Sequence, residues 1–382
     1  MSTPTALDEL RARIASVDRE ILTLAAERLS LAASVGETKR AAGLAVRNHA
    51  TEADVIARFR TLADELQLDQ EFAASLARTL ISESVRHQEE QRNLRNRSAS
   101  SGETTKDAST EQSMRVLVVG GAGKMGRWLA RFFAAQGHVV QTFDTAGPVE
   151  GFAHAADIRE ALNADVILLA MPLSAGPATL REVFALEPRG LVADISSLKS
   201  HLIADLCDGA ARGLRVASLH PLFGPNARTL SGRIMTVCDC GNAAAADDAV
   251  ALFRDTALTI TRMPVEQHDE YMQYVLGLSH LVSVLFFTTL ERSGYAFNDL
   301  STMASTTFYK QARTAAEVSR ENPRMYHEIQ QLNKHSPDLY KLVEQLLRDI
   351  ESAALSTDSR EFVELMERGR AWFPASLPVE LG

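Results

Sequence analysis

Residues 115–133 read RVLVVGGAGKMGRWLARFF, and this stretch decides the fold of the larger part of the chain. A strand-like run leads into Gly121, Gly123 and Gly126 in G-x-G-x-x-G spacing, and a helical pattern follows over 124–136. Glycines let backbone amides approach a pyrophosphate, and the N-terminus of the helix favours its negative charge. This order of strand, turn and helix predicts a Rossmann-type α/β domain that binds a dinucleotide.

An acidic residue, Asp144, ends the next strand-like run, VVQTFD. An acid about 20 residues after the glycines accepts a hydrogen bond from the ribose 2′-hydroxyl and would repel a 2′-phosphate, so NAD is favoured over NADP. A glycine turn without a cofactor is the weaker alternative, because strand, helix and acid coincide. The residues expected to hold NAD are Gly121, Gly123, Lys124, Met125, Gly126 and Asp144.

Strand-like and helical runs alternate beyond this unit, which implies crossover connections and a parallel sheet. From about residue 264 the pattern is wholly helical. We therefore expect a doubly wound domain over 114–263 and an all-α dimerisation domain over 264–382. The later strand-like runs cover residues 139–143, 166–170, 191–194, 216–219 and 234–238.

Residues 96–113, NRSASSGETTKDASTEQS, contain no large apolar side chain, so we expect a flexible linker. Before it, residues 1–95 show the apolar spacing of three and four that is typical of helices. Two shorter helices centre on residues 55–66 and 72–81, and dimerisation is expected to complete the core of this all-α bundle. The long first helix carries an apolar seam of Leu7, Leu10, Ile14, Val17, Ile21, Leu24, Leu31 and Val35.

Each helix of the bundle places polar side chains where its apolar face continues. Arg28 and Lys39 do so on the first helix, Glu52 on the second, and Ser84 and Gln88 on the third. Buried cations need carboxylates or an anionic ligand. The pattern leaves both an anion-binding site and a structural ion-pair network open.

Charge and composition exclude several classes of protein. A formal net charge of −9 over 382 residues argues against general nucleic-acid binding. The three cysteines are too few for a disulfide framework, and Cys238-x-Cys240 lies apart from other metal ligands, so we expect no metal site and a reducing cytoplasm. No secretory signal or membrane span is expected, and the apolar run over 274–290 is interpreted as a buried helix.

Candidate catalytic side chains follow the strands at the edge where such sheets bind ligands. DISSLK offers Ser197 and Lys199, and LHPLFGP offers His220. A histidine at a strand end beside a cofactor is favoured as a general base over a structural role. His280, on the apolar helix, would by itself indicate a core histidine.

The stretch LDELRARIASVDREILTLAAERLSLAASVGETK, with Glu52, Ser84 and Gln88 downstream, resembles the all-helical chorismate mutase family over residues 5–92. The resemblance implies the rearrangement of chorismate to prephenate, which depends on holding a reactive conformer and stabilising charge. By resemblance, the substrate carboxylates would be bound by Arg28 and by Arg11 from a partner chain. The ether oxygen would face Lys39 and Gln88, and the hydroxyl region would face Glu52 and Ser84.

Two departures from that family concern the mutase site. The family usually has an acid at position 48 and an arginine at position 51, whereas this chain has Asn48 and Thr51. Weakened or retuned mutase activity is expected, and a non-catalytic dimerisation or effector module is the alternative.

From residue 114 onward the chain resembles prephenate dehydrogenase, on the motifs GGAGKMG, DISSLK, LHPLFGP, VEQHDEYM and GLSHLV. The order of the two halves matches the bifunctional chorismate mutase/prephenate dehydrogenases of tyrosine biosynthesis. The resemblance implies oxidative decarboxylation of prephenate by NAD⁺ to 4-hydroxyphenylpyruvate. By resemblance, His220 would take the proton of the ring hydroxyl, Ser197 would orient that hydroxyl or His220, Lys199 would meet substrate charge, and His268 and His280 would line the site.

One departure from the dehydrogenase family leaves the substrate carboxylate without its usual partner. Relatives carry an arginine where this chain has Glu317, and Arg313 or Arg320 could supply the charge. A slip in the alignment and an altered preference, for instance toward arogenate, remain open. A different NAD-linked hydroxyacid dehydrogenase is a further alternative.

Overall fold

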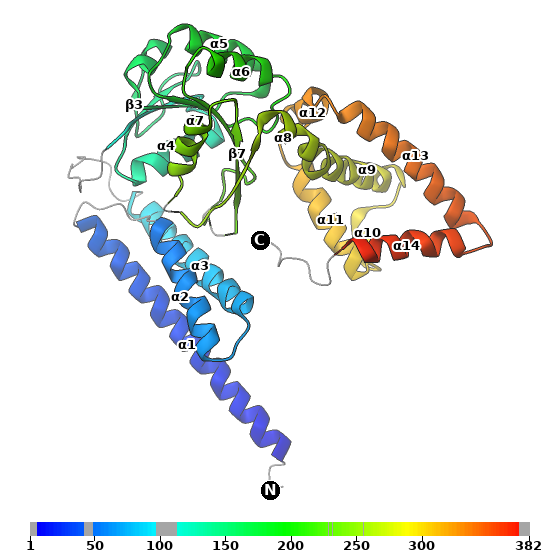
Figure 1. The fold of residues 1–382 in the computed structure, drawn as a ribbon. Helices are drawn as coiled ribbons and strands as arrows, with labels where there is room; N and C mark the ends of the chain where they lie inside the picture. Colours follow the sequence, from blue (N-terminus) through cyan, green and yellow to red (C-terminus); the bar gives the residue numbers. More distant parts are fainter. Residues whose placement is uncertain are drawn as a thin grey trace.

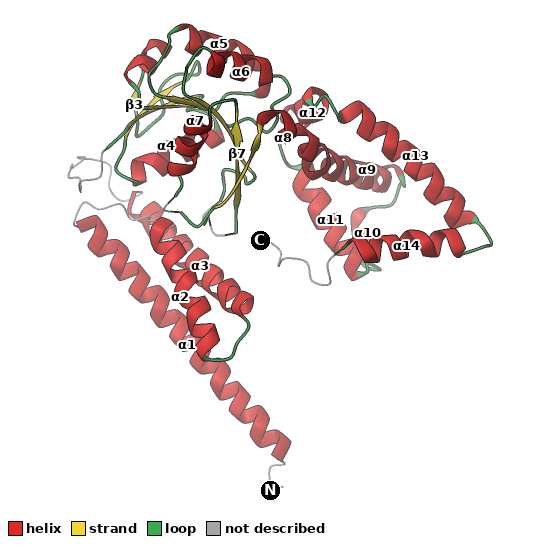
Figure 2. Cartoon of the chain, in the orientation of Figure 1, coloured by secondary structure: helices red, strands yellow, loops and turns green. Residues whose placement is uncertain are grey.

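The computed structural model describes residues 6–41, 49–96, 113–227, 229–230, 232–254 and 256–373. The chain forms an N-terminal helical bundle, a central sheet covered by helices, and a C-terminal set of helices (Figure 1). Among these residues, strands occur only in the central part, as Figure 2 shows. Most of the sequence expected to be a linker, residues 97–112, lies outside the described residues.

The N-terminal bundle contains α1 (Ala6–Ala41), α2 (His49–Glu65) and α3 (Gln70–Asn96). Its buried core is small and lies between α2 and α3. The first half of α1 extends beyond the other two helices (Figure 1). The predicted apolar seam is therefore open to solvent in the single chain, with Ile14 61% exposed and Leu24 64% exposed. A helix that exposes such a seam needs a further surface to cover it.

The central sheet has eight strands in the order β3-β2-β1-β4-β5-β6-β7-β8. Pairs from β3 through β6 are parallel, as predicted, because helices or turns cross over between them. The strands are β1 (Arg115–Val119), β2 (Val139–Phe143), β3 (Ala153–His154), β4 (Val166–Leu169), β5 (Leu191–Asp194), β6 (Val216–Pro221), β7 (Ile234–Asp239) and β8 (Thr259–Pro264).

Three features of this sheet differ from the expectation. β7 is antiparallel to β6, because the described residues of the connecting loop 222–233 form no helix that could carry the chain across the sheet. β8 is parallel to β7 but shows no run of buried apolar residues, so its sequence gives little signal. β3 has only two residues.

Helices cover both faces of the sheet (Figure 1). One core packs α4 (Lys124–Ala135) and α7 (Ala243–Ala251) on the first face, with stacked rings of Trp128, Phe132 and Phe253. The second core lies under η1 (Ile158–Asn163), α5 (Gly176–Ala185) and α6 (Ile203–Ala211), and the short turn η2 (Leu173–Ala175) precedes α5. Because both faces are covered, β4 and β5 are continuous apolar runs.

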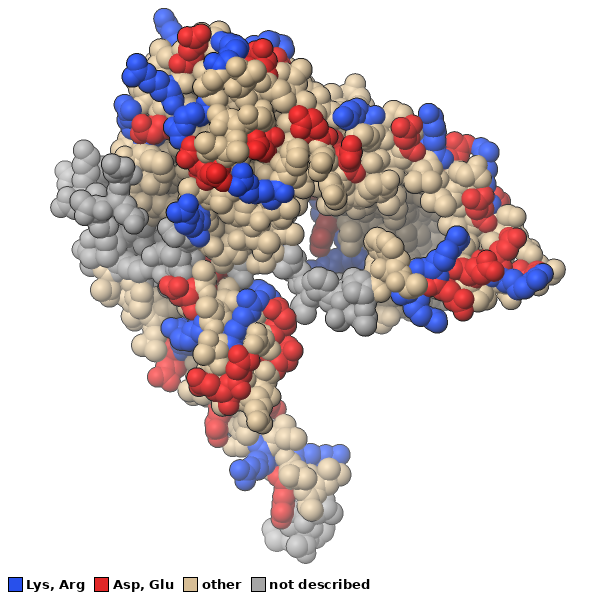
Figure 3. All heavy atoms as spheres, in the orientation of Figure 1, with Lys and Arg blue, Asp and Glu red and all other residues tan. Residues whose placement is uncertain are grey.

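The C-terminal part is helical from Val265 onward, where β8 has ended. It forms an open frame that is hollowed in the space-filling view, where acidic and basic side chains are interspersed (Figure 3). Its helices are α8 (Val265–Met272), the π-helical turn η3 (Gln273–Leu278), α9 (Ser279–Arg292), α10 (Phe297–Ser301), α11 (Thr306–Ser319), α12 (Pro323–Leu332), α13 (Ser336–Leu355) and α14 (Arg360–Trp372).

The apolar run over 274–290 is helical, but the expectation that it is buried is wrong for the single chain. Val282 and Leu285 of α9 are 42% and 51% exposed. By length and composition, the helical stretch Val265–Arg292 is apolar enough to cross a membrane. Its first turns are nevertheless packed inside the molecule, where His268 and Asp269 are buried.

Candidate functional site

The turn between β1 and α4 is shaped by its glycines. Gly120 has a φ of +82°, and a Cβ added to Gly126 would lie 2.1 Å from the carbonyl oxygen of Gly120. The start of α4 therefore packs directly on the backbone of the turn. Gly123 is the N-cap of α4 and provides no side chain to cap the first amides, which leaves them available to an anion.

Asp144 lies at the end of β2, beside this turn. Its carboxylate accepts hydrogen bonds from the backbone amides of Ala122 and Ala146, each at 2.9 Å. The acid is thus fixed next to the glycines, where a ribose hydroxyl can reach it. Lys124 is exposed and Met125 half-buried at the start of α4. The turn, the uncapped helix and the acid together fit a bound NAD.

Lys199 is fully buried behind the carboxyl ends of β5 and β6. Its ammonium lies 2.7 Å from an oxygen of Asp194 and 2.7 Å from the carbonyl oxygen of Leu219, to which it donates hydrogen bonds. An ion pair that is excluded from water on both sides is strongly held, and breaking it would leave a buried charge. The predicted role of Lys199 at the charge of a substrate stays a prediction, and in the single chain its ammonium is paired inside the protein.

His220 occupies the carboxyl end of β6 and is 3% exposed. Its Nδ1 lies 3.0 Å from Nε2 of His268, and Nδ1 of His268 lies 2.7 Å from an oxygen of Asp269. Asp269 also accepts hydrogen bonds from the backbone amides of Lys199 and Ser200. Three side chains from a strand end and from α8 thus form one buried hydrogen-bonded chain.

Burial lowers the pKa of His220 well below its usual value, and the nearby His268 and Lys199 lower it further. Burial also lowers the pKa of His268. Burial would raise the pKa of Asp269, but hydrogen bonds from His268 and Ser200 hold it below its ordinary value. At neutral pH the chain therefore consists of two neutral imidazoles and one carboxylate.

Ser197 and His280 are the other dehydrogenase residues predicted from sequence. Ser197 lies half-buried in the loop after β5, two residues before Lys199. His280 is on α9 and stacks on Tyr326 of α12, with 4.2 Å between ring centroids. Burial lowers the pKa of His280 to about 4. No hydrogen bond among the described residues joins His280 to the chain of His220 and His268.

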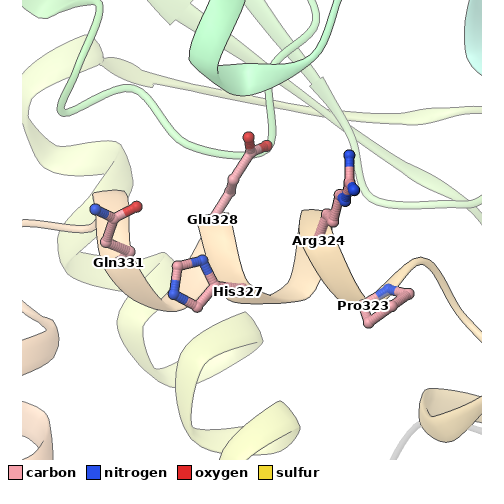
Figure 4. Close-up of a pocket in the computed structure, with 5 residues that line it drawn as sticks. All are labelled: Pro323, Arg324, His327, Glu328 and Gln331. Atoms are coloured by element: carbon pink, nitrogen blue, oxygen red, sulfur yellow. The ribbon is translucent and has the colours of Figure 1, made fainter.

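α12 packs across the same edge of the sheet. Its apolar face meets residues that follow three strand ends: Leu173, Leu198 and Leu222. An adjacent face of α12 lines a cavity of about 390 Å³ with Pro323, Arg324, His327, Glu328 and Gln331 (Figure 4). The side chains of Arg324 and Glu328 extend from α12 to the same side (Figure 4).

The expected replacement for the arginine missing at position 317 is only partly available. Arg313 is paired with Glu317 itself, at 3.2 Å, on the exposed face of α11. Arg320 is exposed at the end of α11. Arg324 is a third cation, which sequence reasoning missed, and its guanidinium has no ion pair within the part of the chain that the structure describes.

The N-terminal bundle brings together only some of the predicted mutase residues. The guanidinium of Arg28 donates to the carbonyl oxygen of Leu80, at 3.1 Å, and to the hydroxyl of Ser84, at 3.2 Å. Burial and the nearby charge of Arg58 lower the pKa of Arg28. Arg28 and Arg58 thus place two cations close together, which favours an anionic ligand.

Glu52 is buried, and its carboxylate contacts a loop outside the bundle. It accepts a hydrogen bond from the backbone amide of Leu230, at 3.2 Å, in the loop between β6 and β7. This contact crosses from the bundle to the nucleotide-binding part. The role of Glu52 at a substrate hydroxyl stays a prediction.

Arg11 is exposed on α1 and lies 3.7 Å from Asp8, so the single chain does not bring it to Arg28. Lys39 and Gln88 lie in α1 and α3, but their side chains are outside the described residues, as are Asn48 and the side chain of Thr51. Cys238 and Cys240 are buried, and burial raises the pKa of Cys238 to about 12. Over the described ranges, no three histidine, cysteine or acidic side chains are grouped as metal ligands.

Sequence reasoning missed Asp194, Asp269, Arg58 and Arg324. Asp269 had a signal, because it follows His268 directly in the motif VEQHDEYM. Asp194 also had one, since it opens DISSLK. Arg58 lies seven residues after Thr51, which is about two turns of α2 and the same face. Only the packing of α12 against the sheet reveals Arg324.

Comparisons with protein families match three successive parts of the chain. Residues 10–89 match the model for chorismate mutase type II. Residues 149–273 match the prephenate dehydrogenase nucleotide-binding domain, and residues 264–368 match the prephenate dehydrogenase dimerization domain. The glycine turn precedes the second match, so its assignment depends on the geometry described above.

Two curated relatives resemble nearly the whole chain, and a third resembles part of it. The T-protein of Enterobacter agglomerans is 23% identical over 369 residues, which cover 96% of this chain and 93% of the relative. The T-protein of Haemophilus influenzae is 23% identical over 380 residues, with coverage of 98% and 94%. The 4-amino-4-deoxyprephenate dehydrogenase of Streptomyces pristinaespiralis is 28% identical over 236 residues, which cover 58% of this chain and 79% of the relative.

Solved structures share the fold of the part after the linker. Prephenate dehydrogenase from A. aeolicus, in complex with hydroxyphenyl propionate and NAD⁺, superposes with a TM-score of 0.53 and 17% identity over 69% of this chain and 99% of that one. Synechocystis arogenate dehydrogenase gives a TM-score of 0.51 and 16% identity over 68% and 99% of the two chains. With a mutase domain followed by both dehydrogenase domains, the chain belongs to the family of bifunctional chorismate mutase/prephenate dehydrogenases.

Proposed function

We propose that the two halves of this protein catalyse consecutive reactions of tyrosine biosynthesis. The N-terminal bundle rearranges chorismate to prephenate, and the remainder oxidises and decarboxylates prephenate to 4-hydroxyphenylpyruvate. The observation that carries this proposal is the neutral, buried His220 at a strand end of the sheet that also carries the glycine turn, in a chain whose matched domains follow the order mutase, then dehydrogenase.

In the dehydrogenase, the glycine turn and Asp144 would hold NAD⁺, which would supply the acceptor for the hydride that leaves the carbinol carbon of prephenate. Nε2 of His220 accepts the hydroxyl proton as the carbonyl forms. The bond between the ring and its carboxylate carbon then breaks, and carbon dioxide leaves. The electron pair of that bond stays with the ring, which becomes aromatic. The proton on His220 returns to the phenolate oxygen of the product, so one hydride and one carbon dioxide are the net losses.

Binding of the substrate's remaining charge falls to α12 in this proposal. Arg324 faces the cavity beside the sheet edge and would bind a substrate carboxylate through charge-assisted hydrogen bonds. Ser197 would orient the hydroxyl or His220, and His280 would form part of the wall beside Tyr326. Lys199 would stabilise the site by linking Asp194 at the end of β5 to the carbonyl oxygen of Leu219 in β6.

In the mutase, Arg28 and Arg58 would bind the two carboxylates, with Ser84 beside them. Arg11 would enter from a second copy of the chain, and Lys39 and Gln88 would face the ether oxygen. We expect weakened mutase activity, because position 51 lacks an arginine and the carboxylate of Glu52 accepts a hydrogen bond from the amide of Leu230. The same contact of Glu52 supports the second candidate, a non-catalytic N-terminal module on a prephenate or arogenate dehydrogenase.

We further propose the division of the chain at residues 95, 113 and 263, a homodimer, and a cytoplasmic location. The end of the last strand at Pro264 supports the third boundary. The match to a dimerization domain supports the dimer.

Incubation of the purified protein with chorismate and NAD⁺ tests both activities together. We expect NADH and 4-hydroxyphenylpyruvate to form. Without NAD⁺, chorismate should disappear while prephenate accumulates. Stable chorismate with active prephenate oxidation would select the second candidate, and no NADH from either substrate would refute the dehydrogenase.

A further inference from the structure

The dehydrogenase site contains a buried carboxylate that the reaction steps above do not use. Asp269 on α8 is fully buried and accepts hydrogen bonds from the backbone amides of Lys199, at 2.9 Å, and Ser200, at 2.6 Å. Its own backbone carbonyl accepts from the side chain of Asn333, which follows α12. Contacts from the loop after β5 and from the residue after α12 thus fix Asp269 in one position.

The hydrogen bonds determine which nitrogens carry protons. An ionised carboxylate only accepts, so the 2.7 Å contact requires a proton on Nδ1 of His268. Neutral His268 then has a lone pair on Nε2, and the 3.0 Å contact requires a proton on Nδ1 of His220. The lone pair of His220 is therefore on Nε2, the nitrogen that is left for the substrate hydroxyl.

We infer that Asp269 is a positioning residue, which acts through His268 to hold His220 in the tautomer whose Nε2 accepts the substrate proton. This inference rests on the proposed dehydrogenase activity. When His220 becomes an imidazolium, it donates to His268, which in turn donates to Asp269. The negative charge of Asp269 then stabilises the positive charge of His220. Asp269 itself stays ionised.

The surrounding charges make this assistance necessary. Lys199 lies close enough to oppose protonation of His220, and His268 opposes it as well. The ammonium of Lys199 is paired with Asp194, so that acid is already engaged. Asp269 is the nearby group that favours the imidazolium.

The test compares D269N with E270Q, which removes a neighbouring acid of α8 whose side chain is exposed. The amide of D269N can donate to Nδ1 of His268. The proton of His268 would then lie on Nε2, and that of His220 on Nε2 as well, which leaves no lone pair there for the substrate. We expect kcat for prephenate to fall by roughly 10²-fold or more, while KM, NAD⁺ affinity and mutase activity persist. The acid limb of the pH profile should move to lower pH, because loss of the negative charge lowers the pKa of His220. E270Q should match the unchanged protein.

A second variant, H268Q, cuts the chain while it keeps Asp269 and its contacts to the backbone. It should show a loss of similar size, and D269N/H268Q should be scarcely worse than either single variant, because the residues act as one unit. If D269N does not fold, H268Q alone decides. Unchanged kcat and pH profile in a folded variant, or fully additive losses, would overturn the inference, whereas an unchanged protein without prephenate-dependent NADH formation would refute the proposed function instead.

Discussion

His220 is buried among His268, Lys199 and Asp269, and its environment sets when it can act as a base. Burial lowers its pKa well below the usual range, and His268 and Lys199 lower it further, while Asp269 raises it by a smaller amount. The imidazole is therefore neutral at every pH above that lowered value. A base must be neutral to accept a proton, so we expect His220 to serve as the base throughout that range.

This predicts that kcat/KM for prephenate stays level as the pH falls through about 6.5, the ordinary pKa of histidine, and declines only in more acidic solution. Initial rates of NADH formation across the acid range measure it, with mutase rates on the same samples as a control for unfolding. An acid limb at or above about 6.5 would contradict the assignment of His220 as the base.

Arg324 is the cation that the cavity beside α12 offers to a carboxylate. Removal of a charge-assisted hydrogen bond costs about 1.5–3 kcal/mol, which corresponds to roughly 10- to 100-fold in binding. R324Q should therefore raise KM for prephenate by about that factor, with a smaller change in kcat. R320Q removes an exposed arginine at the end of α11 and should leave KM unchanged. A larger rise of KM in R320Q than in R324Q would indicate that Arg320 binds the carboxylate instead.

At the scale of elements, the turn from β1 into α4 depends on the absence of one side chain. A Cβ on Gly126 would lie 2.1 Å from the carbonyl oxygen of Gly120, which is a backbone atom and cannot rotate away. α4 would have to shift from the turn, and the first amides of the helix would move with it. The dinucleotide site and the packing of α4 are thus determined by the same contact.

G126A should lower NAD⁺ affinity by at least about tenfold and reduce the melting temperature. G369A is the matched control, because Gly369 also lies in a helix, α14, yet has open space where a Cβ would be added. Alanine there should be neutral or stabilising by up to about 1 kcal/mol. Equal NAD⁺ affinities of both variants, measured by titration calorimetry, would count against the glycine turn as the cofactor site.

At the scale of the whole molecule, two apolar surfaces of the single chain face solvent. One is the seam of α1, and the other includes Val282 and Leu285 of α9 in the part that matches a dimerization domain. Burial of these apolar surfaces against a second copy of the chain would stabilise the assembly. A second copy of the chain would cover the exposed half of α9.

If the α1 seam completes the mutase site, I14D should reduce mutase activity by at least about tenfold, because a buried charge opposes association there. Dehydrogenase activity and the mass of the dimer should be unchanged, because the α9 surface would still hold the two copies together. I14D/L285D should be a monomer by light scattering. S16D, on the opposite side of α1, is the matched control. A normal mutase rate in I14D would show that α1 does not complete the site.

Local sequence determined much of the architecture. The apolar periodicity marked the long α1, the runs around β1, β4 and β5 marked the strands, and the glycines with Asp144 marked the dinucleotide site, because each pattern reports a local backbone preference or a continuous buried face. It also identified His220 as the candidate base. The weak pattern of β8 and the two residues of β3 carried too little of that signal.

The tertiary structure decided what each polar side chain faces. Lys199 and Glu52 were expected at ligands, yet the sheet edge pairs the first with Asp194, and the loop after β6 brings the amide of Leu230 to the second. Asp269 reaches His220 only because α8 packs under the carboxyl ends of β5 and β6. The contacts of Glu52 and Asp269 join residues tens of positions apart, and no local periodicity encodes them, since they depend on which elements meet and at what angle.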